Sequence, residues 1–276
     1  MNKTKNLLWI LCLCGGLLWT AQSVGQTIDD NYVKTYKALT PIAGDISTIN
    51  DKTKVTEGVE YYDGLGRPLQ AVVRQGTPLG YDFVTFWVYD AYGRKTKSYL
   101  PYATNEVSGS VKSLPITGQA LFHQNQVGAS DGQYAFSVQL LESSDLARVM
   151  KQGAPGAAWQ PVDADPYNNN DHTIKKRYEV NGANEVFRFS YDGTTGLVSL
   201  SVVAALRYYD QEQLYANKTL DENNNEVIEY TDKEGRTVCK KVKASATEYA
   251  CTYYLYDTVG NLVAVVPPEA VKKFNP

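Results

Sequence analysis

The sequence has few of the residues that most often carry catalysis or metal binding. Its 276 residues include two histidines, His123 and His172, and four cysteines. It contains no H-E-x-x-H zinc motif, and no glycine-rich loop precedes a helix-like segment to hold a phosphate. We therefore expect no catalytic site, no cofactor site and no metal site in this chain.

Charge is also scarce and nearly balanced. Charged residues make up 21% of the chain, with 27 lysines and arginines against 30 aspartates and glutamates and a net charge of −3 at pH 7. Proteins that bind nucleic acid usually carry a basic excess, so nucleic acid is not an expected partner. Tyrosine, by contrast, is abundant at 21 residues. Because tyrosine suits a half-buried pleated surface, this composition predicts a mainly β protein.

Long apolar runs are absent except near the N-terminus. Leu7–Leu18 is apolar and follows two lysines, and Ser23–Gly25 then supplies small residues. This order is typical of a secretory signal peptide. We therefore predict that residues 1–25 are removed, that the protein is exported to the periplasm, the cell surface or the medium, and that no membrane span remains. An uncleaved anchor, or a lipoprotein signal at Cys14, is the alternative.

Two cysteines remain after this cleavage, Cys239 and Cys251. Each lies in a strand-like stretch, and a hairpin centred on Ser245 would place them opposite each other. Cross-strand Cβ atoms lie about 4.5–5.5 Å apart, which is near the reach of a disulfide. Two outcomes stay open: a disulfide, as an oxidising compartment favours, or two free thiols with the register slipped by one or two residues.

Short repeated segments are the main feature of the chain. Four of them share the pattern Y-D-x-x-G-R/N, with the tyrosine displaced in one. Asp221–Asn225 keeps the spacing with asparagine in the glycine place, and Tyr191–Gly196 is a related segment with one more residue before its glycine. The repeat residues are Asp63, Gly66, Arg67, Asp90, Gly93, Arg94, Asp232, Gly235, Arg236, Asp257, Gly260 and Asn261. Aspartate accepts a hydrogen bond from the backbone two residues on, and glycine at the fourth position suits a left-handed conformation. Each segment therefore predicts the turn of a β-hairpin, with the arginine pairing with the aspartate or covering a tyrosine ring.

The ordered series resembles the YD repeats of the RHS (rearrangement hotspot) family. The string from Tyr61 to Tyr102, together with stretches up to Val271, is similar to the N-terminal region, a domain of unknown function preceding the RHS core, of exported Bacteroidetes-type RHS proteins. The resemblance implies a non-enzymatic segment of a secreted protein, contributing to a β-shell that encapsulates or delivers a C-terminal effector. The implied partners are the RHS core and the effector segment, which this sequence does not contain.

The expected fold is mainly β, with antiparallel hairpins of YD-repeat type in an elongated or partly curled sheet. We predict an N-terminal β region with two such hairpins over residues 26–125. A non-repeat β-rich insert should follow over 126–215, with one short helix near 143–151. Further hairpins should occupy 216–276, where the chain looks truncated.

A second hypothesis is a secreted carbohydrate-binding or adhesive β-module, whose partner would be a cell-surface glycan. Trp87 and Trp159 are then the candidates for stacking on sugar rings, although Trp87 lies in an alternating strand and is better explained as core. Asp163–Asp171 is rich in the oxygen ligands that calcium prefers, but it departs from the EF-hand pattern. A calcium site there is the less favoured interpretation of what is otherwise a polar loop.

Overall fold

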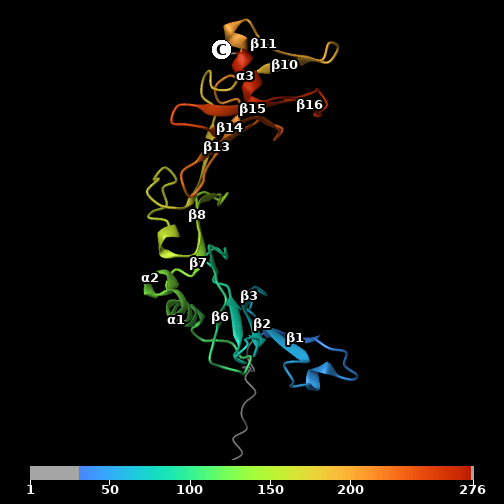
Figure 1. Ribbon diagram of the computed structural model, residues 1–276, viewed down its shortest axis with the longest axis vertical. Helices are drawn as coiled ribbons and strands as arrows, with labels where there is room; N and C mark the ends of the chain where they lie inside the picture. The colour runs from blue at the N-terminus through green and yellow to red at the C-terminus, as the bar shows by residue number, and fades with distance from the viewer. Residues whose placement is uncertain (1–30, 275–276) are drawn as a thin grey trace, which may run out of the picture. The chain divides into compact units, whose positions relative to one another are not determined.

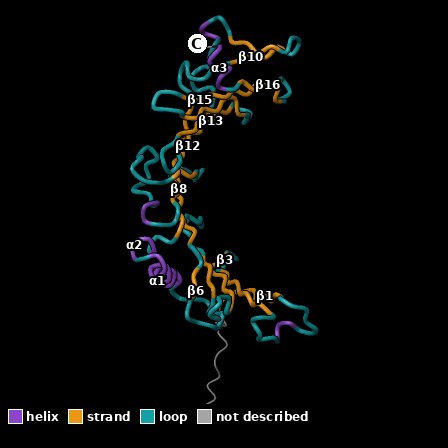
Figure 2. Tube along the Cα trace, in the orientation of Figure 1, coloured by secondary structure: helices purple, strands orange, loops and turns teal. Residues whose placement is uncertain are grey.

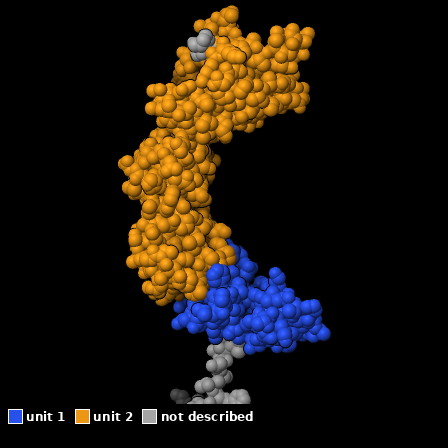
Figure 3. Space-filling model, in the orientation of Figure 1, with its two compact units in different colours: residues 1–84, 104–113 blue, residues 85–103, 114–276 orange. Residues whose placement is uncertain are grey.

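The computed structural model describes residues 31–274, so the predicted signal peptide lies outside the described residues. The chain divides into two compact units, coloured separately in Figure 3. Unit 1 takes in the described residues up to 84 together with 104–113, and unit 2 takes in 85–103 and the residues from 114 on. In both units strands far outnumber α-helices among the described residues, so the mainly β prediction is confirmed (Figure 2).

The first sheet has five strands. In order across the sheet, they are β1 (Asn31–Ala38), β2 (Val55–Tyr62), β3 (Pro68–Arg74), β4 (Phe83–Phe86) and β6 (Tyr102–Ala103). The sheet is antiparallel where β1 pairs with β2 and β2 with β3. The first three lie in unit 1, and β4 begins there and ends in unit 2. Every second residue of β2 is buried, including Val55, Val59 and Tyr61. This period of two is what a strand with one face on a core produces.

The larger sheet belongs to unit 2 and is antiparallel at each pairing (Figure 1). Its order is β16-β15-β14-β13-β12-β9-β8-β7-β5. The bounds are β5 (Lys97–Tyr99), β7 (Phe136–Leu141), β8 (Val149–Gly153), β9 (Ile174–Val180), β12 (Tyr215–Leu220), β13 (Glu226–Thr231), β14 (Thr237–Lys243), β15 (Tyr249–Tyr256) and β16 (Leu262–Val266). The predicted insert and the predicted C-terminal repeats therefore share one continuous sheet.

A small hairpin and three α-helices complete unit 2. β10 (Phe189–Asp192) pairs with β11 (Leu197–Leu200), and Figure 1 shows this hairpin beside α3 (Pro268–Phe274). The other α-helices are α1 (Pro115–Val127) and α2 (Ala129–Gly132). Single-turn 3-10 helices are η1 (Ile46–Thr48) in unit 1 and η2 (Ala157–Trp159) and η3 (Ala204–Leu206) in unit 2.

The helix predicted near 143–151 is wrong. Residues 143–146 form bends and a turn, and β8 begins at Val149. The reason is the pairing of β7 with β8: the Glu142 N–H donates to the Arg148 carbonyl over 2.9 Å at the end of the hairpin. The Arg148 guanidinium also donates to both carboxylate oxygens of Glu142, with distances of 2.8 Å each. The structure instead has its longest described helix at α1, where proline occupies the first turn.

The main core lies on the meander from β12 to β16. Its fully buried members include Leu214, Tyr230 and Cys239, packed with the nearly buried Tyr253 and Leu255. Tyr230 keeps its hydroxyl satisfied by donating to Glu185, as a buried polar group requires. The strands of this meander therefore pack on a buried core, and the core holds the strands from which the hairpin turns project.

Candidate functional site

The turns predicted from the repeats share one hydrogen-bonding scheme. In the first, the Asp63 N–H donates to the Arg67 carbonyl over 2.9 Å, and the Gly66 N–H donates back to the Asp63 carbonyl over 3.0 Å. The Asp63 carboxylate accepts from the N–H groups of Leu65 and Arg67 at 2.9 and 2.8 Å. The same four bonds recur at Asp90, Asp221, Asp232 and Asp257.

The fourth turn residue has positive φ in each case. The values are +77° at Gly66, +76° at Gly93, +80° at Gly235, +97° at Gly260 and +62° at Asn224. Glycine adopts this conformation freely, and asparagine tolerates it better than most other residues. The turn with asparagine in the glycine place is therefore a genuine member of the series.

The last turn residue ties its side chain to the aspartate. Nε of the arginine donates to Oδ2 at 2.7 Å in the Asp63 and Asp232 turns and at 2.8 Å in the Asp90 turn. Asn225 and Asn261 make the equivalent bond through Nδ2, at 2.8 and 2.9 Å. Arg94 and Arg236 also lie over the rings of Tyr92 and Tyr256, with 4.9 and 5.3 Å to the centroids.

These contacts hold the turn carboxylates in the charged form. The pKa of Asp63 lies below its usual range because the backbone N–H and then the side chain of Arg67 bond to it. The pKa of Asp257 is lowered in the same direction by the Asn261 side chain and backbone. A carboxylate bonded in this way acts as a structural acceptor within its turn.

Two of these turns lie at one end of the larger sheet and border a cleft. Because antiparallel strands reverse direction, the turns at Asp232 and Asp257 fall at the same end, separated by the hairpin of β14 and β15. The cleft has a volume of about 400 Å³ and is lined mainly by aromatic residues of β10 and β15 and by the two turns. None of its residues was a candidate site from sequence except Asp232, Arg236 and Asp257.

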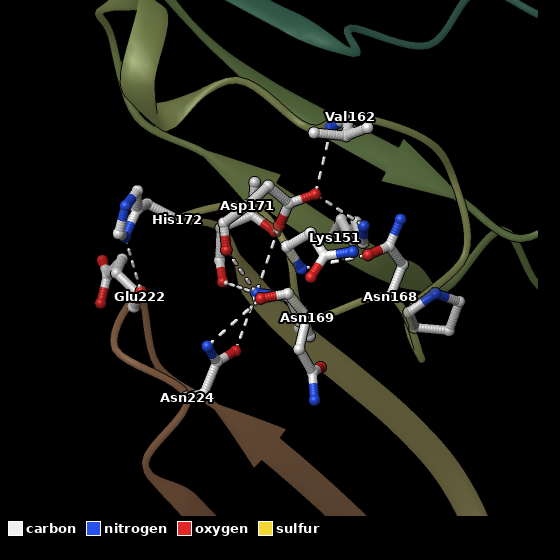
Figure 4. Close-up of polar contacts among 12 residues, drawn as sticks. Lys151, Val162, Asn168, Asn169, Asp171, His172, Glu222 and Asn224 are labelled. Atoms are coloured by element: carbon white, nitrogen blue, oxygen red, sulfur yellow. Dashed lines mark hydrogen bonds and ion pairs between the residues drawn. The ribbon is translucent and has the colours of Figure 1, made fainter.

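A second polar cluster is buried in the larger sheet (Figure 4). Lys151 and Lys175 have no exposed side-chain surface, and the Asp171 carboxylate bonds to both. Its Oδ2 lies 2.7 Å from Lys151 Nζ and its Oδ1 lies 3.2 Å from Lys175 Nζ. Lys175 also donates to the carbonyls of Asp171 and Thr173 and to Asn224 Oδ1, at 2.9, 3.0 and 3.3 Å. This cluster joins β8, β9 and the Asp221 turn.

The electrostatics of the cluster favour the charged carboxylate. Burial alone would raise the pKa of Asp171, but hydrogen bonds from Lys151 and Thr173 outweigh it and lower that pKa well below its usual range. Asp163 adds a second carboxylate, 3.2 Å from Lys151 Nζ. In the loop considered for calcium, the carboxylates of Asp163 and Asp171 are therefore paired with lysine ammonium groups.

The two cysteines do not face each other as the centred hairpin predicted. Cys251 pairs with Lys241 and Cys239 pairs with Tyr253, a register two residues away from the prediction. The loop runs from Ala244 to Glu248, closed by the Ala244 N–H bond to the Glu248 carbonyl. Both thiols are free, Cys239 is buried, and burial raises its pKa to about 12.

The tryptophans proposed for stacking are not gathered at a common site. Trp87 is half-buried immediately after β4, and Trp159 is 40% exposed in η2, with its ring 5.7 Å from the ring of His172. Within residues 31–274, no group of three or more His, Cys, Asp or Glu side chains is placed to hold a metal ion. In the same range, no helix is long and apolar enough to cross a membrane.

The geometry defines a β-rich protein whose hairpins are closed by a repeated Asp-x-x-Gly turn. The family model of DUF6443, a domain of unknown function, matches residues 34–176, more than half of the chain. The chain belongs to the DUF6443 family.

Among solved structures, the chain is similar to the one titled "Crystal Structure of TcdB2-TccC3". The sequence identity is 15% and the TM-score 0.42, and the match covers 80% of this chain and 9% of that one. This chain therefore spans less than a tenth of the length of that protein. No curated protein matches the chain.

Proposed function

We propose that the chain is a non-enzymatic structural segment of an exported RHS/YD-repeat protein. Its strands would form part of a β-shell around a C-terminal effector carried elsewhere on the full polypeptide. The observation that carries the proposal is the pair of turns at Asp232 and Asp257, which repeat one hydrogen-bonding scheme at one end of a continuous meander. Further copies of such a hairpin can be added along the chain, and each copy extends the sheet by two strands.

The edge of the larger sheet supports the same proposal. β16 is the last strand on its side in the described residues, paired on one flank with β15. The backbone groups of an edge strand are ready to pair with a further strand. A following repeat of the RHS core is the partner that the proposed shell supplies, and export through the predicted signal peptide would place it outside the cytoplasm.

The proposal is tested on the full-length protein purified from its source. Electron cryomicroscopy should show the sheet continuing past β16 into a closed shell, and limited proteolysis should spare the C-terminal segment until the shell is opened by denaturant. A sheet that stops at β16, with a C-terminal segment cleaved at the rate of an unfolded peptide, would overturn the shell role. Export is tested separately by N-terminal sequencing, which should begin at Gln26.

A further inference from the structure

The cleft at the Asp232 end of the larger sheet has no part in the proposed shell. Its volume of about 400 Å³ falls within the roughly 300–1,000 Å³ typical of small-molecule sites. All of its lining residues belong to unit 2, so one compact body builds it. The cleft is therefore a candidate binding site in its own right, independent of the role proposed above.

The base of the cleft is rigid. Phe189 packs edge-on against Tyr253 with 4.9 Å between ring centroids, and Tyr253 is only 3% exposed. The Tyr253 hydroxyl accepts the Phe187 N–H over 3.3 Å, which ties β15 to the segment that leads into β10. Aromatic rings held this way present a fixed apolar surface without losing side-chain entropy on binding.

At least three hydrogen-bonding groups at the cleft are not used by the described part of the chain. The hydroxyls of Tyr191 and Tyr209 make no hydrogen bond with any residue in 31–274. Arg236 donates from Nε to Asp232, and its Nη2 contacts the carboxylates of Asp232 and Glu234. Its Nη1 makes no hydrogen bond within the same range. Tyr191 is 36% exposed, so its ring is open to a ligand.

The two carboxylates at the cleft already have hydrogen-bond donors within their own turns. Asp257 accepts from Val259 and from both donors of Asn261, at 2.8 to 2.9 Å. Asp232 is similarly engaged by its own turn. Both oxygens of each carboxylate therefore already accept hydrogen bonds, while the neutral tyrosine hydroxyls and the ring surfaces remain available to a ligand. The ligand that fits is uncharged, rich in hydroxyls and apolar on one face.

We propose that this cleft binds a neutral saccharide of one or two sugar units. The C–H face of a pyranose ring would pack on the Tyr191 ring, and its hydroxyls would bond to the Tyr191 and Tyr209 hydroxyls and to Nη1 of Arg236. These contacts combine an apolar platform with a few placed polar groups, the pattern usual in small-molecule sites. The tyrosines, and not the two tryptophans considered from sequence, then carry the recognition.

The test uses an array of immobilised neutral oligosaccharides of glucose, galactose, mannose and N-acetylglucosamine, followed by saturation-transfer NMR on any that bind. The protein should bind at least one of them, and Tyr191→Ala should weaken that binding by about tenfold or more, the effect of losing one good contact. Tyr191→Phe and Tyr209→Phe remove only the hydroxyls, and each should weaken binding without disturbing the fold.

The chain itself supplies a matched control. Arg236→Asn leaves a side chain that closes the turn as Asn225 and Asn261 do, while it removes the guanidinium from the cleft. Arg94→Asn makes the same change in a turn that does not line the cleft. The first variant should weaken binding and the second should not. Absence of binding to every oligosaccharide on the array, or equal binding by the unaltered protein, Tyr191→Ala and Arg236→Asn, would overturn the proposal.

Discussion

Lys151 and Lys175 lie directly opposite each other on β8 and β9, and both side chains are fully buried. Like charges at facing positions of a sheet destabilise it, and burial makes the repulsion stronger. The sheet tolerates this pair because Asp171 places one carboxylate oxygen on each ammonium group. The three side chains therefore act as one unit, and each depends on the other two.

Removal of the shared carboxylate should destabilise unit 2 strongly. Asp171→Asn leaves two buried ammonium groups facing each other, and loss of one partner from a buried ionic group typically costs about 3–5 kcal/mol. Urea denaturation followed by circular dichroism measures the loss. Asp163→Asn is the control, because Asp163 bonds to Lys151 from an exposed position and its loss should cost far less. Equal stability of the two variants would show that the cluster does not hold the strands.

The same group makes stability depend on acid. Because the pKa of Asp171 is lower in the folded protein than the roughly 3.9 of an unfolded aspartate, its stabilising contribution is complete above that value. It is lost as the pH falls through the unfolded value towards the folded one. The free energy of unfolding should therefore decline from about pH 5 downwards, and less steeply in Asp171→Asn than in the unaltered protein. Identical pH profiles for the two proteins would contradict this.

The turns could be predicted from sequence because every donor and acceptor lies within five consecutive residues, as from Asp63 to Arg67. The lysine cluster could not, because it joins two strands and the loop between them, and lysine is usually exposed. The segment at 143–151 carries capping residues that suit a helix, and the pairing of Glu142 with Arg148 across the hairpin overrode them. In both cases the pairing of neighbouring strands, which propensity and capping residues do not reveal, made the difference.

The fourth turn residue offers a direct test of the turn chemistry. A Cβ added to Gly66 would meet no atom within 4 Å, so the cost of Gly66→Ala comes from its φ of +77° and should be about 1–2 kcal/mol. Gly66→Asn should cost less, since Asn224 already occupies that position at +62°. Thermal unfolding of both variants measures the order of their stabilities. Asn224→Gly is the reference, and it should leave stability unchanged or raise it. An asparagine variant less stable than the alanine variant would refute the conformational argument.

The register of β14 against β15 determines how the cysteines react. Burial raises the pKa of the Cys239 thiol to about 12 and also raises that of Cys251, so both should react slowly with iodoacetamide in the folded protein and rapidly in urea. Because Lys241 lies opposite Cys251, the substitution Lys241→Cys places a new thiol at a cross-strand distance of about 4.5–5.5 Å. On mild oxidation, peptide mapping should find position 241 joined to Cys251 and Cys239 still free. A Cys239–Cys251 link in the unaltered protein would instead establish the hairpin centred on Ser245.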